Sequence, residues 1–179
     1  MKSSLQARQR WIMTWVLVAF FLVIMPFMTY WFYQKVGIMD TPDTLFYYTP
    51  ATLFSLANVY GSDGVAFYAT LHFTFDVAFP VVYGLFFLLW FESFFQGSRI
   101  LPYAKTAIVL GVLFDFVENI GVTIVMTEYT MASTRMDELA LVTAIASGLK
   151  WLMILGSLGF MVFGMYQKKH RGTSSSVGQ

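Results

Sequence analysis

Four long apolar segments limit this chain to very few folds. They cover residues 11–33, 65–91, 106–127 and 139–166, and each has at least 22 residues. About 20 helical residues cross the hydrocarbon core of a bilayer. Only helices and closed barrels satisfy their backbone polar groups there, and segments of this length lack the alternation of barrel strands. The sequence therefore predicts an all-α polytopic membrane protein, built as a four-transmembrane-helix bundle.

The composition excludes several other classes of protein. Hydrophobic residues make up 58% of the chain and charged residues only 12%, whereas soluble domains carry about 25% charge. The net charge is +1 and there is no cysteine, which argues against a basic nucleic-acid-binding protein and a disulfide scaffold. The expected partner is the lipid bilayer, with no nucleic acid. A length of 179 residues allows one compact unit.

The distribution of basic residues predicts the orientation. If the amino terminus is cytoplasmic, the cytoplasmic side carries eight lysines and arginines and the outer side carries two, Lys35 and Arg135. This positive-inside bias places both termini in the cytoplasm. Together with the absence of cysteine it fits the bacterial cytoplasmic (inner) membrane. The eight are Lys2, Arg8, Arg10, Arg99, Lys105, Lys168, Lys169 and Arg171. The outer side also receives six acids, Asp40, Asp43, Asp63, Glu128, Asp137 and Glu138.

The connecting segments carry further signals. In the long outer loop 34–64, Thr49 and Pro50 form an N-cap and N1 pair and Gly61 suits a helix end, which predicts a short interfacial helix over 50–60. A helix packed as a lid on the bundle is the alternative. We expect Pro26 to kink the first helix. Residues 1–171 then form one membrane domain, and the polar stretch 172–179 is expected to be a disordered cytoplasmic tail.

Four ionisable residues fall inside the apolar segments at similar depth. They are Asp76, Asp115, Glu118 and Lys150. Spacings of three and four residues place polar neighbours on the same helical faces, so we expect the three faces to meet in one buried site. The candidate proton- or ligand-binding residues are Tyr68, His72, Asp76, Tyr83, Asp115, Glu118, Asn119 and Lys150.

Charges inside a membrane indicate function more often than structure. A lone charge at the bilayer centre costs roughly 2.5–3.5 kcal/mol on insertion scales, and three carboxylates do not balance one lysine. We favour a proton shared by Asp115 and Glu118 as a coupled pair. A protonated His72 and a bound cation are the alternatives.

Metal chemistry has little support in the sequence. Only two histidines exist, His72 and His170, which excludes a three-histidine zinc hydrolase. A carboxylate-rich set of His72, Asp76, Asp115 and Glu118 stays open, although its spacing is not diagnostic. We expect no resident metal and no cofactor.

Three functions fit these residues. The first is a proton- or cation-linked site for a small ligand, used for binding or transport. The second is a non-enzymatic accessory or assembly protein whose charges hold the helices together. The third is a membrane enzyme acting on a lipid or isoprenoid, which needs an acid–base pair such as His72 and Glu118. Transport would require a homo-oligomer, with small residues of the fourth helix at its interface: Ala140, Ala144, Gly148 and Gly156.

Two short motifs resemble a set of small four-helix bacterial membrane proteins. One is Asp76 followed by Phe79-Pro80 and Tyr83-Gly84, and the other is the segment Phe114-Asp115-Phe116-Val117-Glu118-Asn119. The likeness covers about a third of the chain. It implies the same four-helix architecture and supports the acids and Asn119 as residues to test, and it carries no activity.

Overall fold

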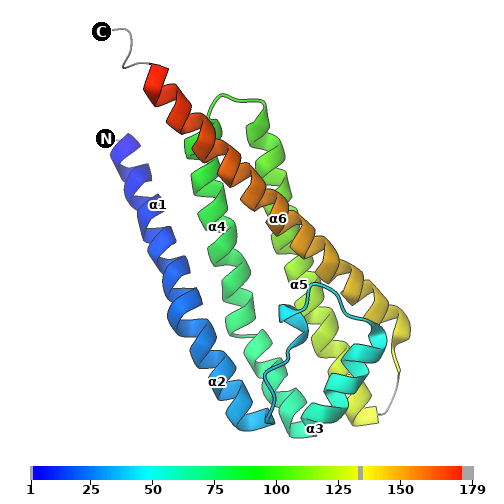
Figure 1. Ribbon diagram of the computed structural model, residues 1–179. Helices are drawn as coiled ribbons and strands as arrows, with labels where there is room; N and C mark the ends of the chain where they lie inside the picture. Colours follow the sequence, from blue (N-terminus) through cyan, green and yellow to red (C-terminus); the bar gives the residue numbers. More distant parts are fainter. Residues whose placement is uncertain (1, 133–134, 175–179) are drawn as a thin grey trace.

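The computed structural model describes residues 2–132 and 135–174, and all regular secondary structure in these ranges is helical. Four helical stretches are long and apolar enough to cross a membrane. They are Ser4–Val36, Pro50–Phe95, Ile100–Ala132 and Asp137–His170. In Figure 1 they lie along one another as a bundle, and α1 begins at the end where α6 finishes. The predicted all-helical class with four long apolar helices is confirmed.

The first stretch changes its helical pitch before a proline. It consists of α1 (Lys2–Ala19), a π-helical turn (Phe20–Ile24) and α2 (Met25–Val36). Because Pro26 has no N–H, the α-helical bond to the Leu22 carbonyl cannot form, and the wider π turn lies at this point. Gly37 ends α2 in the left-handed region (φ 84°), where its N–H donates to the Tyr33 carbonyl at 2.8 Å. A glycine without Cβ suits this terminus.

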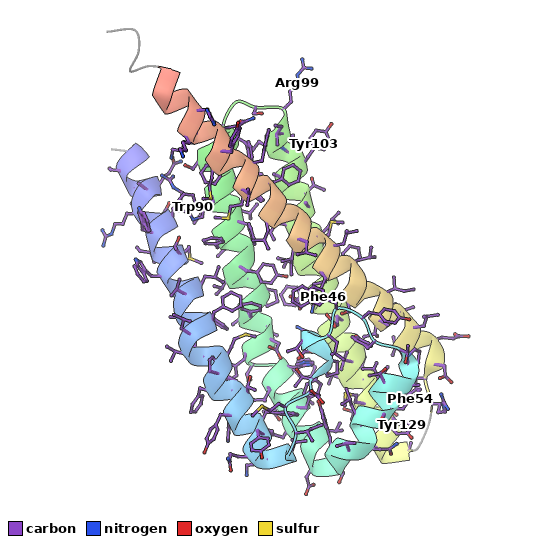
Figure 2. All side chains as sticks on the ribbon, viewed as in Figure 1. Phe46, Phe54, Trp90, Arg99, Tyr103 and Tyr129 are labelled. Carbon is purple, nitrogen blue, oxygen red and sulfur yellow. The ribbon has the colours of Figure 1, made fainter. Side chains whose placement is uncertain are left out.

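Residues 37–49, which follow α2, return into the bundle and are called the inserted segment below. Figure 1 shows this segment, in cyan, rising from the end of α2 to about half the height of the bundle. It contains the short 3₁₀ helix η2 (Pro42–Thr44), and the Leu45 carbonyl accepts a hydrogen bond from Trp151 Nε1 at 3.2 Å. Trp151 lies 14 residues into α6, about 21 Å along the helix axis. In Figure 2, Phe46 accordingly lies midway between Tyr103 and Tyr129.

Helix α3 (Pro50–His72) begins where the sequence predicts a helix. The Thr49 and Thr52 side chains each bond the other's backbone N–H, a reciprocal capping box. Gly61 interrupts the helix with φ 64° and ψ 178°. The first half packs on α5: the rings of Phe54 and Tyr129 lie 4.8 Å apart, and they sit together in Figure 2. This half therefore covers part of the bundle, as the lid alternative describes.

The prediction of one continuous helix over 65–91 is wrong, because the helix is interrupted after His72. Helix α4 (Phe75–Phe95) starts after a two-residue turn formed by Phe73 and Thr74. Inside α4, Pro80 has no N–H for the carbonyl of Asp76, four residues earlier. The side-chain amide of Asn119, from α5, donates to that carbonyl at 3.1 Å. A neighbouring helix thus supplies the hydrogen bond that the proline removes.

The last two helices form the closest pair. They are α5 (Ile100–Ala132) and α6 (Asp137–Ser174). A Cβ on Gly121 would overlap the Thr143 hydroxyl oxygen and lie 3.1 Å from its Cγ2, so only glycine permits this approach. Residues 172–174, from the stretch expected to be a disordered tail, continue α6, and residues 175–179 lie outside the described ranges.

Two apolar cores flank the middle of the bundle. One surrounds the inserted segment and α3 and includes Phe32, Leu53 and Tyr60. The other fills the half nearer the chain ends and is mainly phenylalanine, with members from α4 and α5. Its buried members are Tyr83, Phe86, Phe87, Phe91, Phe94, Phe95, Ala104 and Ile108.

The hydrogen bond between Asn119 and the Asp76 carbonyl yields a testable coupling. Asn119→Leu should cost about 1–3 kcal/mol of unfolding free energy, because it leaves a carbonyl without a partner. In a Pro80→Ala background the restored N–H can satisfy that carbonyl, so the same change should cost clearly less. Thermal unfolding of the four proteins of this double-mutant cycle in detergent measures the coupling.

The matched control is Asn58→Leu. Asn58 also donates a side-chain hydrogen bond across helices, to Tyr129, but lies far from Pro80 along the chain. Its cost should be the same in both backgrounds. An equal cost of Asn119→Leu with and without Pro80 would contradict the assignment.

Candidate functional site

A buried lysine cluster joins α5 and α6. It consists of Lys150, Glu118 and Asp115. Lys150 Nζ forms a close ion pair with Glu118 Oε2 and lies 3.9 Å from Asp115 Oδ1. The Lys150 and Glu118 residues are 4% and 0% exposed, so neither charge is hydrated. The two carboxylates, one turn apart on α5, meet through the ammonium group.

Two tyrosines complete the coordination of these carboxylates. The Tyr83 hydroxyl, from α4, donates to Asp115 Oδ2 at 2.8 Å. The Tyr48 hydroxyl, from the inserted segment, donates to Glu118 Oε1 at 3.2 Å and also lies 3.4 Å from the Thr143 carbonyl oxygen. Hydrogen bonds to charged acceptors are stronger than those between neutral groups. The lysine cluster therefore ties α4, α5, α6 and the inserted segment together.

A second, aspartate–histidine cluster lies at the break between α3 and α4. It consists of Asp43, His72 and Asp76. His72 Nε2 lies 3.0 Å from Asp43 Oδ1 and 3.3 Å from Asp76 Oδ2. The Tyr68 hydroxyl donates to Asp43 Oδ1 at 2.8 Å. The His72 side chain is buried, whereas the side chains of Asp43 and Asp76 are 25% and 32% exposed.

The other nitrogen of His72 is held by α5. Its Nδ1 lies 3.2 Å from Thr123 Oγ1, and the Thr123 hydroxyl donates its proton to the Asn119 carbonyl at 2.8 Å. A hydroxyl has only one proton to donate. Thr123 therefore accepts from His72, so Nδ1 carries a hydrogen and Nε2 is the nitrogen that faces the two aspartates.

All eight candidate residues take part in these contacts. Asn119 connects the two clusters, because it follows Glu118 on α5 and bonds the Asp76 backbone. His72 and Glu118, the acid–base pair of the lipid-enzyme alternative, engage different partners. Asp115 and Glu118 face Lys150 rather than His72, so the open carboxylate-rich metal set does not assemble as a whole.

Sequence reasoning missed three residues of the site. Asp43 and Tyr48 belong to a segment assigned to the outer loop, and Asp43 was grouped with the outer acids. Thr123 lies one turn beyond Asn119 on the polar face of α5, where helical spacing identifies it. For the other two the available signal is the aromatic run at 46–48, which is too apolar for a solvated loop.

Among the residues that the structure describes, only the aspartate–histidine cluster brings three potential metal ligands together. Single ligand atoms of Asp43, His72 and Asp76 lie within 4.8 Å of one another. Two carboxylate oxygens and one imidazole nitrogen form a donor set that divalent first-row metals accept. The sequence analysis expects no resident metal and leaves open only a different set that lacks Asp43, because it assigns Asp43 to the outer loop.

Comparison with known proteins gives no family assignment. No protein-family model, no curated protein and no solved structure matches the chain. Function is therefore argued from the site itself.

The Tyr48 hydrogen bond predicts how firmly the inserted segment is held. Tyr48→Phe removes the donor to Glu118 and should cost about 1.5–3 kcal/mol, as expected for hydrogen bonds to charged groups. The matched control is Tyr47→Phe at the adjacent, 74% exposed tyrosine, which should leave stability unchanged. Thermal unfolding and limited proteolysis of the detergent-purified chain measure both effects. Equal behaviour of the two variants would contradict the role of Tyr48.

Proposed function

We propose that this chain is an integral protein of a bacterial inner membrane, with four spans and both termini in the cytoplasm. The four long apolar helices support the placement. The start of α1 and the end of α6 lie at one end of the bundle (Figure 1), as an even number of spans requires. The excess of basic residues on the same side supports the orientation.

We further propose that the mid-membrane clusters form a proton- or cation-linked binding site for a small ligand, used for binding or transport. The insertion of residues 37–49 carries this proposal. Non-helical backbone at membrane depth is tolerated only where protein buries it or where it lines a cavity. Here it brings Asp43 and Tyr48 to His72 and Glu118. Charges that only hold helices together do not require such a segment, whereas transporter sites are commonly built from broken helices at mid-membrane.

The charge balance supports a bound proton or cation. The lysine cluster has two carboxylates and one ammonium group, so one shared proton makes it neutral. The aspartate–histidine cluster has two carboxylates around one nitrogen, so it needs positive charge at that nitrogen. Unbalanced charge is costly in a low-dielectric interior. The site is thus suited to take up and release positive charge.

Part of the site is exposed, whereas the half of the bundle nearer the chain ends is filled by apolar side chains. Asp43 and Asp76 retain partial exposure, while the phenylalanine-rich core fills the bundle between the lysine cluster and the chain ends. A continuous pore is therefore not favoured. A site that binds from the outer side, with any release to the cytoplasm requiring the phenylalanine core to rearrange, fits this arrangement.

The proposed shared proton has a direct spectroscopic test. At neutral pH the wild-type chain in lipid vesicles should show the infrared carbonyl band of a protonated carboxylic acid. Asp115→Asn or Glu118→Gln should remove this band, because each variant leaves one carboxylate to balance Lys150. Infrared difference spectra recorded as the pH is changed measure the band.

The control is Glu92→Gln, because Glu92 pairs with Lys105 at the cytoplasmic end of the bundle. This variant should keep the band. A wild-type spectrum without the band, or a band that survives both cluster variants, would overturn the shared proton.

The accessory-protein alternative is favoured by one observation: every carboxylate of the lysine cluster has a close partner. If the cluster is glue, Lys150→Met alone should cost about 3–5 kcal/mol, and Lys150→Met with Glu118→Gln should recover much of it. If the charges are held for function, the single changes should leave stability unchanged or raise it. Thermal unfolding in detergent distinguishes the two results.

A homo-oligomer through α6 remains part of the proposal. Ala140 and Ala144 pack inside the chain, so the available part of the small-residue stripe is Gly148 and Gly156. A Cβ on either glycine meets no atom of the chain within 4 Å, which leaves room for close approach of another helix.

A further inference from the structure

The aspartate–histidine cluster has the features of a divalent metal site rather than of a simple hydrogen-bonded group. Its three donor atoms come from three places in the sequence: the inserted segment, the end of α3 and the start of α4. In a tetrahedral site with ligand distances near 2.0–2.2 Å, donor atoms lie about 3.3–3.6 Å apart. The two separations from His72 Nε2, 3.0 and 3.3 Å, are close to this range.

Surrounding residues orient these donors as outer-shell residues do in metal proteins. Thr123 holds Nδ1 of His72 as an N–H, so in neutral His72 the lone pair is on Nε2 and faces Asp43 and Asp76. Tyr68 donates to Asp43, and its ring lies tilted at 49° against the imidazole, with ring centroids 4.1 Å apart. Metal-ligating histidines and carboxylates almost always have such outer hydrogen bonds.

Charge separates the two ways of filling the cluster. A proton on Nε2 gives an imidazolium between two carboxylates and leaves one negative charge, which a second proton on an aspartate would have to neutralise. A divalent cation bound by neutral His72 balances both carboxylates. Because His72 is buried, the arrangement in which its imidazole stays neutral is less costly than the arrangement with an imidazolium.

We propose that Asp43, His72 and Asp76 bind one divalent first-row transition metal ion through Asp43 Oδ1, His72 Nε2 and Asp76 Oδ2. Three protein ligands leave at least one coordination position open for water or a small ligand. The partial exposure of Asp43 and Asp76 provides the entry path. This inference deepens the proposed function, on which it rests, by naming the cation of the cation-linked site.

The test is metal binding to the full-length chain, purified in detergent with a tag that contains no histidine. After treatment with a chelator, Zn²⁺ alone is titrated in by calorimetry. We expect one ion per chain. Asp43→Asn, His72→Gln and Asp76→Asn should each abolish detectable binding, and Thr123→Val should weaken it about 10–100-fold, as loss of an outer-shell partner does.

Matched controls exist for each ligand. Asp40→Asn changes an exposed acid of the same inserted segment, Asp63→Asn changes an exposed acid of α3, and His170→Gln removes the other histidine. All three should bind Zn²⁺ as the wild type does. Stoichiometric binding that is unaffected by changes at Asp43, His72 and Asp76 would overturn the proposal.

A second readout does not depend on whether the variants fold. Co²⁺ bound to the wild-type chain should show a first shell of one imidazole nitrogen and carboxylate oxygens by X-ray absorption. A shell without imidazole, or no stoichiometric binding, would overturn the metal site and leave an imidazolium between two aspartates. The protonated-carboxyl band of Asp115 and Glu118 would stand in either case, so failure of this inference and failure of the proposed function are distinguishable.

Discussion

Lys150 sets the condition that the centre of this bundle has to meet. Its ammonium group is buried inside the bundle, and a buried charge has to be matched within contact distance. Glu118 and Asp115 on α5 supply the match. Two carboxylates then need donors of their own, which are the hydroxyls of Tyr83 and Tyr48. Tyr48 can reach Glu118 only because residues 37–49 enter the bundle, so the path of the chain outside the helices also follows from this one charge.

The same condition applies to the backbone. Pro80 leaves the Asp76 carbonyl without its helical donor, and Asn119 provides one from α5. The inserted segment has no helix to satisfy its carbonyls, and the Trp151 indole donates to one of them. Irregular backbone and buried charge thus occur at the same depth. Helix side chains there donate to the irregular backbone, and a side chain of the inserted segment donates to a buried carboxylate. A break in a helix there costs little once those donors are present.

The sequence predicts the features that depend on local pattern. It misses the features that depend on the inserted segment, which returns into the bundle from a loop position. Apolar length identifies four helices, and Thr49 with Pro50 and Gly61 identifies the first half of α3. Helical spacing places each intramembrane acid, and Lys150, on the polar face of its own helix. The break after His72 falls at Phe73 and Thr74, where no proline or glycine marks it in the sequence. Asp43 was placed with the outer acids because loop charges are assigned by side of the membrane, not by depth.

The two clusters differ in a way that suggests separate roles. The lysine cluster is enclosed and each of its carboxylates has a tyrosine donor, so its geometry is fixed and only a proton can be gained or lost there. The aspartate–histidine cluster lies at a helix break, and two of its three side chains are partly exposed. It can therefore exchange a larger cation with its surroundings. Asn119 joins them, because its side chain holds the Asp76 backbone while its neighbour Glu118 pairs with Lys150. Under the proposed function, Asn119 is the residue through which a change of charge in one cluster would reach the other.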